Sequence, residues 1–274
     1  MKPFKKLFPA VLTFIFALSL TFSGAAAAAA SMQWSASQQA AVDRATASDA
    51  ALRSKLGSLY SRFKDLQSQL QQVDQSISSL HYKNEETQSS LTKQIKVIDA
   101  DKIARLEQAV KQTKDKYKPI LTMYTTLNQQ ITTANKLKNK QLSSALKTQV
   151  DTMKLAVQMA KMDIQNKEQA LASAKAQRSS AQKKIRGILA GADSVRIKIK
   201  AEKSTATILN KNVSPLWKGV TQAVKVGDAK KIHTDLNTLV NQLLQIQSQK
   251  QKILSLENQI SGILQNAKSQ LPST

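Results

Sequence analysis

The sequence predicts an all-α protein, an elongated antiparallel helical bundle or coiled coil. Apolar residues recur at alternating steps of three and four from Asp49 to Leu271, which is the spacing of one helix face. Short polar turns interrupt this rhythm at only a few places, which leaves no segment for a sheet. An ordinary amphipathic stripe in a globular bundle would give the same fold class, so only the elongation separates the two interpretations.

The first 30 residues have the organisation of a secretory signal peptide. Residues 1–6 carry three lysines, residues 7–22 are apolar, and a run of alanines ends at Ala30. A basic start, an apolar core and small residues at a cleavage point are typical of such a signal. We therefore expect cleavage near Ala30. The alternative is an uncleaved membrane anchor, because residues 7–30 are just long enough to span a bilayer.

Residues 31–274 form the predicted helical domain. A short helix over 34–46 comes first, and the long helices that follow are expected at 49–97, 101–136, 139–189, 193–226 and 228–271. Each long helix begins beside Asp, Asn or Ser, whose side chains accept hydrogen bonds from the free amides of a helix start. Each turn is interpreted as a tight reversal, which makes sequential helices antiparallel.

Long and short helices alternate in this series, which predicts a weak internal repeat of about ninety residues. Leu52, Leu142 and Ile232 lie ninety residues apart at matching points of the pattern. The sequence then contains about two and a half copies, at approximately 34–136, 139–226 and 228–271. Low complexity in Lys, Gln, Ser and Leu could imitate part of this similarity.

Two prolines fall late in the predicted short helices. Pro119 and Pro215 each remove a backbone hydrogen bond, at a cost of about 3 kcal/mol inside a helix. The apolar spacing keeps its phase across both, so we expect the helices to kink there and continue. The alternative is a true break, with Ser214 capping a new helix in the second case. Trp217 is expected to fill the space that a kink opens.

Several polar residues occupy apolar-stripe positions. They are Asn84, Thr87, Lys167, Arg178, Lys250 and Glu257. Polar residues in a helical seam set the register of the helices or the number of chains that associate. They therefore serve either the packing of this chain on itself or the docking of a second copy.

Charge is the feature that indicates a partner. The chain has a net charge of +23, and removal of the three signal lysines leaves +20. Lysines recur at multiples of seven along one flank of the third long helix: Lys140, Lys147, Lys154, Lys161 and Lys175, with Glu168 in the gap. Such a row suits a flexible phosphate polymer. The alternative is a solvated flank whose spacing follows from keeping the seam apolar.

Little in the sequence favours catalysis. The chain has no cysteine and two histidines. His81 and Glu85 lie four residues apart, the minimum for a metal pair, but the usual meaning of such a pair is an exposed helix contact. No phosphate-binding glycine loop and no nucleophile elbow is present. We therefore predict no catalytic residue, cofactor, metal or small-molecule substrate.

These observations predict a secreted, non-enzymatic helical scaffold or binding protein of the bacterial cell envelope, retained on an anionic surface by its basic charge. An anionic wall polymer, a membrane surface, a protein partner and self-association are all compatible partners. The alternative is an exported polyanion- or nucleic-acid-binding protein that uses the lysine flank of the third helix. No aromatic residues alternate with these lysines, which disfavours nucleic-acid binding by base stacking.

Overall fold

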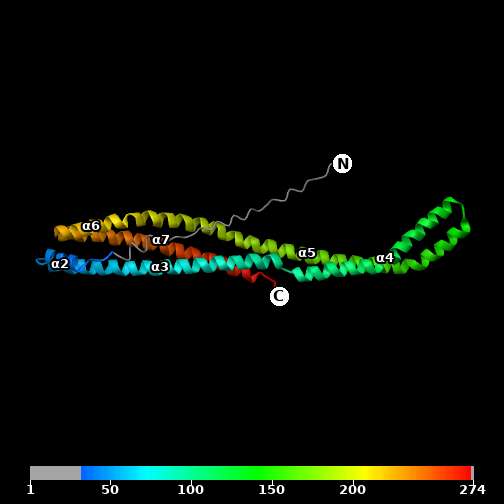
Figure 1. The fold of residues 1–274 in the computed structure, drawn as a ribbon, viewed down its shortest axis with the longest axis horizontal. Coiled ribbons are helices and arrows are strands. Elements are labelled where there is room, and N and C mark those ends of the chain that lie inside the picture. The colour runs from blue at the N-terminus through cyan, green and yellow to red at the C-terminus, as the bar shows by residue number, and fades with distance from the viewer. Residues whose placement is uncertain (1–31, 273–274) are drawn as a thin grey trace. The chain divides into compact units, whose positions relative to one another are not determined.

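The computed structural model describes residues 32–272, and the predicted signal peptide lies outside them. These residues form helices and no strand, which confirms the all-α class (Figure 1). The helices are α2 (Ala36–Ala45), α3 (Ala50–Val97), α4 (Ala100–Lys136), α5 (Lys140–Lys211), α6 (Val213–Val226) and α7 (Ala229–Ser269).

The described chain divides into two compact units. The first contains the residues up to Gln75 together with Glu202–Lys252. The second contains Ser76–Ala201 together with the residues from Ile253 onward. Each unit therefore contains parts of α3, α5 and α7. Helices α2 and α6 belong to the first unit, and α4 belongs to the second.

The core of the first unit is built around a stack of aromatic rings. The ring centroids of Trp34 and Tyr60 are 3.9 Å apart, and those of Phe63 and Trp217 are 5.2 Å apart. Tyr60 joins the two pairs, with its centroid 6.1 Å from that of Phe63. Trp217 therefore stacks on a ring of α3, which is more specific than the space-filling role that its position beside a proline predicted. Stacked aromatic pairs add to the burial of their area.

The helices of the first unit run in both directions. Helix α2 is antiparallel to α3, because the Trp34 amide donates to the Tyr60 hydroxyl across 26 residues of chain. Gln242 donates to the carbonyl of Leu209 at 2.8 Å, which pairs α7 with the end of α5. Helices α3 and α7, which are not neighbours in sequence, are parallel to each other in this unit.

Two contacts show the parallel pairing of α3 and α7. Gln247 Nε2 donates to Gln69 Oε1 at 2.5 Å, and Lys250 Nζ lies 2.5 Å from Asp74 Oδ2. The residue numbers rise together along the two helices, as a parallel pair requires. The Lys250 side chain is buried, so this ion pair is part of the helix interface.

In the second unit, α4 and α5 form an antiparallel hairpin closed by the turn at 137–139 (Figure 1). The side chain of Asn139 accepts a hydrogen bond from the amide of Leu142 at 3.1 Å, as the capping pattern predicted. Asp49 and Asp228 cap α3 and α7 in the same way, through the amides of Leu52 and Lys231. Local capping chemistry was therefore a sound guide to where these helices begin.

The predicted reversal at residues 98–101 is wrong. Helix α5 contacts the end of α3 through Gln182, which donates to the Ile95 carbonyl, and it contacts α4 through the pair of Lys175 and Glu107. As the residue number rises from Ile95 in α3 to Glu107 in α4, the number of the contacting residue on α5 falls from 182 to 175. Both helices therefore run antiparallel to α5, and α3 and α4 point in the same direction as each other (Figure 1). Asp99 adopts a left-handed conformation with φ of 51° and makes no side-chain cap.

The predicted turn at 191–194 is also wrong, because α5 continues through it to Lys211. Ser194 Oγ donates to the Gly191 carbonyl, and Asp193 pairs with Arg196 at 3.1 Å, so the polar side chains are satisfied within the helix. Ala192 is fully buried. Ile263 of α7 lies 3.8 Å from where a Cβ of residue 191 would stand, so this glycine sits at a helix contact.

The helix break that was expected near 191 occurs at Asn212, between α5 and α6. Pro215 is therefore the third residue of α6, and the prediction that it lies inside a continuous helix is wrong. A proline is tolerated in a first turn because the amides there have no helical partner. Ser214 is not the cap, since the cap position belongs to Asn212. Pro119, in contrast, lies inside α4, which continues through it as predicted.

The ninety-residue repeat remains a prediction. The chain from Ala50 to Lys136 is interrupted at 98–99, whereas the chain from Lys140 to Val226 is interrupted at Asn212. The interruptions therefore fall at different points of the two proposed copies.

Candidate anion-binding flank of helix α5

The predicted lysine flank lies on α5 within the second unit, and all five lysines are exposed. The flank borders α4. Lys175 Nζ lies 2.7 Å from Glu107 Oε1, and Glu168, which fills the gap in the row, lies 2.5 Å from Lys114 Nζ. At this end of the row the charges are used in ion pairs between α4 and α5.

The remaining lysines face a different environment. In an antiparallel pair of heptad helices, a residue seven positions earlier on one helix faces a residue seven positions later on the other. Continuing from Glu107 and Lys114, the next residues of α4 are Leu121, Asn128 and Asn135. None of these three can neutralise a lysine.

A shallow groove shows that this register holds. Lys161 lines it together with Leu121 and Asn128 of α4. Lys140, Lys147 and Lys161 have no ion pair within the described part of the chain. The row therefore changes character along α5, from paired charges near Lys175 to free charges toward the closed end of the hairpin.

Lys154 is intermediate between these two situations. Its Nζ lies 2.6 Å from Asp151 Oδ1, one turn away on the same helix. The hydrogen bond to this carboxylate, and then its negative charge, raise the pKa of Lys154 above the ordinary value for lysine. The ammonium group stays charged, but the neighbouring carboxylate offsets part of its field.

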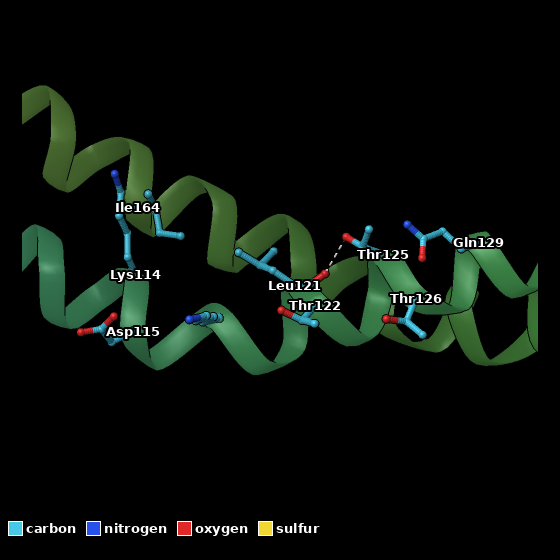
Figure 2. A pocket seen from close by; sticks show the side chains of 9 residues that line it. Lys114, Asp115, Leu121, Thr122, Thr125, Thr126, Gln129 and Ile164 are labelled. Carbon is cyan, nitrogen blue, oxygen red and sulfur yellow. Dashed lines mark hydrogen bonds between the residues drawn. The ribbon is translucent and has the colours of Figure 1, made fainter.

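A second groove lies on the same hairpin, along α4 from Lys114 to Gln129 (Figure 2). Ile164 comes from α5, and the other lining residues come from α4. Lys114, Lys118 and Asp115 bring charges to the groove, and three threonines and Gln129 line its other end. Lys114 is already paired with Glu168, so Lys118 is the ammonium group here with no ion pair among the described residues.

The His81–Glu85 pair was predicted to be an exposed helix contact, and this is wrong for the histidine. His81 Nδ1 lies 3.0 Å from Oε1 of Glu257 on α7, and Glu257 is almost fully buried. Glu85 is 3.5 Å from Arg196 of α5 instead. No group of three or more potential metal ligands occurs within residues 32–272.

Four of the six polar residues at stripe positions contact another helix of the chain: Asn84, Arg178, Lys250 and Glu257. Thr87 instead donates to the Lys83 carbonyl within α3. Asn84 Nδ2 donates to both the side chain and the backbone carbonyl of Glu257, at 3.0 and 2.9 Å. Arg178 donates to the carbonyl of Lys96 at 2.7 Å. Lys167 is exposed. Buried polar groups that satisfy one another in this way fix the register of the helices that carry them.

The sequence interpretation missed a set of exposed apolar residues on the hairpin. Leu155, Met159 and Met162 of α5 are 69%, 62% and 56% exposed. The heptad pattern could have found them, because they lie at outward positions between the seam residues Val150 and Ile164. These residues lie on the polar side of the helix, outside the apolar stripe that predicts its packing.

No protein-family model matches the chain, and no curated protein or solved structure shows significant similarity to it. The described helices include none that is long and apolar enough to cross a membrane.

Proposed function

We propose that this protein is a secreted, non-enzymatic helical binding protein of the bacterial cell envelope, held on an anionic surface by charge. The observation that carries the proposal is the set of free lysines on α5. Lys140, Lys147 and Lys161 are exposed and meet no carboxylate of α4, whereas the lysines of an ordinary interhelical network would be paired.

The overall charge supports the same role. The chain beyond the first 30 residues has a net charge of +20, and the second unit has 24 lysines and arginines against 10 acidic residues up to Ala201. Like charges at this density repel one another, and they attract polyanions with an affinity that falls with salt.

The experiment compares two triple variants of α5. One replaces Lys140, Lys147 and Lys161 by Gln, and its control replaces Lys183, Lys198 and Lys200 by Gln. All six lysines are exposed on one helix, so both variants lower the net charge by three. Binding to polyphosphate is measured over a range of salt concentrations.

We expect the flank variant to lower the affinity and to reduce the slope of log K against log salt by about 2, at roughly 0.7 to 0.9 per lost phosphate contact. The control should change the slope much less. Equal effects of the two variants would show that general charge is responsible, and the lysine flank would then be no site.

The alternative function is the binding of extracellular nucleic acid by the same flank. It predicts release from cells by nuclease as well as by moderate salt, whereas retention on an envelope polymer predicts release by salt alone. Tyr124 is the aromatic residue that lines the groove with Lys161, and it is half-buried in the helix seam. It therefore has little face to offer a base for stacking.

A further inference from the structure

The closed end of the α4–α5 hairpin has a different surface from the remainder of the described chain. We define this end as residues 121–162. Eleven large apolar side chains are strongly exposed in the structure, and six of them lie in this segment: Met123, Leu137, Leu142, Leu155, Met159 and Met162. Exposed apolar side chains that gather in one region mark an interaction site, whereas scattered ones need no explanation.

Three of these residues form a strip on α5. Leu155, Met159 and Met162 follow one another at steps of four and three, which places them on one face of the helix. At 100° per residue this face lies about 140 to 200° round the helix from the buried Val157. The strip therefore points away from α4, and the hairpin seam cannot cover it.

The turn that closes the hairpin also exposes apolar side chains. Leu137 is 73% exposed and stands between Lys136 and Lys138, which is itself held in a left-handed conformation with φ of 54°. Leu142 in the first turn of α5 is also exposed. An apolar tip with flanking ammonium groups can enter an interface without burying a charge.

The positive charge of the same segment indicates that its partner is anionic. Residues 121–162 contain six lysines and a single acidic residue, Asp151. Lys154 and Lys161 lie on the flank between the apolar strip and α4. Leucine and methionine side chains beside lysines, on a helix surface with almost no carboxylates, are the features of helices that lie in the headgroup region of anionic membranes.

We infer that the closed end of the α4–α5 hairpin binds the surface of an anionic lipid bilayer, with Leu155, Met159 and Met162 entering the headgroup region and the lysines contacting lipid phosphates. This inference rests on the proposed function and names the anionic surface. A soluble phosphate polymer would use the lysines but would gain nothing from the apolar strip. A second copy of the hairpin would bring like charges together.

The experiment uses the chain from residue 31 onward, so that the apolar leader cannot itself bind lipid. Binding to vesicles with and without phosphatidylglycerol is measured for the wild type and for the triple variant Leu155→Gln, Met159→Gln and Met162→Gln. Its matched control is Ile197→Gln, at an exposed isoleucine on the same helix outside the closed end. All of these side chains are exposed, and far-ultraviolet circular dichroism verifies that each variant is folded.

We expect the triple variant to weaken binding to anionic vesicles by roughly tenfold or more, because three apolar side chains no longer leave water. Ile197→Gln should leave the affinity unchanged. Binding of the triple variant to polyphosphate should equal that of the wild type, because the lysines remain.

The absence of cysteine permits a second, positional measurement. An environment-sensitive fluorophore is attached to Met159→Cys in one protein and to Ile197→Cys in another. Addition of anionic vesicles should shift the emission to the blue at position 159 and leave it unchanged at position 197.

Each other outcome has a definite meaning. If the triple variant binds anionic vesicles as the wild type does, charge alone acts and the lipid inference is wrong while the proposed function stands. If the protein binds polyphosphate but no vesicle, the partner is a soluble or wall polymer and the inference is again wrong. If it binds neither, both the inference and the proposed function fail.

Discussion

The aromatic core of the first unit and the seam of the α4–α5 hairpin are built from the same heptad pattern, yet they are buried to different degrees. Phe63 is completely buried, and so are Leu236 and Leu239 of α7. In the hairpin, Leu127 and Ile131 occupy equivalent seam positions and are only half-buried. Of all the residues of α4, only Ile103 and Ala134 are buried.

The difference is explained by the number of neighbours that each helix has. Helix α3 is covered in the first unit by α2, α6 and α7, so its seam residues are enclosed. At the closed end of the hairpin the ribbon shows α4 and α5 alone (Figure 1). A seam between two helices leaves one edge of each side chain in water. The hairpin should therefore be the less stable region and the one free to bind.

The largest effect is expected in the aromatic core. Phe63→Ala removes a completely buried ring that stacks on both Tyr60 and Trp217, and it should lower the free energy of unfolding by about 3 to 5 kcal/mol. Urea denaturation followed by tryptophan fluorescence reports on this unit, because both tryptophans lie in it. Ile208→Ala, at an exposed site, should cost less than about 0.5 kcal/mol. Equal costs would mean that the stack is not the core.

The next largest effect is expected at the buried polar contact of the second unit. Glu257→Ala removes the carboxylate that contacts the side-chain amide of Asn84 and the ring of His81, and it should cost about 1 to 3 kcal/mol. Asn84 keeps its hydrogen bond to the backbone carbonyl of residue 257. Glu257→Gln keeps an acceptor of the same shape and should restore part of the loss. The measurement is urea denaturation followed by circular dichroism. An alanine variant as stable as the glutamine variant would contradict the role of this contact.

A smaller effect is expected in the hairpin seam. Ile131→Ala removes a half-buried side chain and should cost about 1 kcal/mol, less than a substitution in an enclosed core. The loss should be local, so hydrogen exchange in α4 and the facing part of α5 should accelerate while exchange around Phe63 stays unchanged. Met123→Ala, exposed on the same helix, is the control. Faster exchange throughout the chain would show that the hairpin is not an independent region.

The smallest effect is expected at the surface ion pair. Lys175→Ala breaks the contact with Glu107, in which both side chains are about half exposed, and should change stability by less than about 0.5 kcal/mol. Whatever loss is found should disappear in high salt. Thermal denaturation at low and high ionic strength measures this. A loss above 1 kcal/mol that persists in salt would mean that the pair is more than a surface contact.

The positions of most helix ends could be predicted from local sequence. Asp49, Asn139 and Asp228 each cap the helix that begins beside them, and Gly227 takes the left-handed conformation that ends α6, with φ of 77°. These are interactions over three or four residues, so they depend on little beyond the local chain. The similar residues at 191–194 misled the prediction because buried Ala192 belongs to a seam that continues.

The candidate site was predicted only in part. The spacing of the lysines could be predicted from the sequence. Which of them lack an ion pair depends on the facing residues of α4: Glu107 faces Lys175, whereas Leu121 shares a groove with Lys161. The exposure of Leu155 could not be read from its identity, because a leucine in a helix can face either a neighbour or water. The missing information was the number of helices packed against α5 at each point.

The sequence by itself determined that this protein is helical, where most helices begin and end, and how strongly basic it is, because periodicity, capping and charge are properties of short stretches. Only the tertiary structure decided that α3 and α4 share one direction along α5, that α3 and α7 are parallel, and that Glu257 is the partner of Asn84 and His81. Those outcomes depend on which apolar faces bury each other when the helices are far apart in the sequence. A local pattern that is equally apolar at every seam position cannot make that choice.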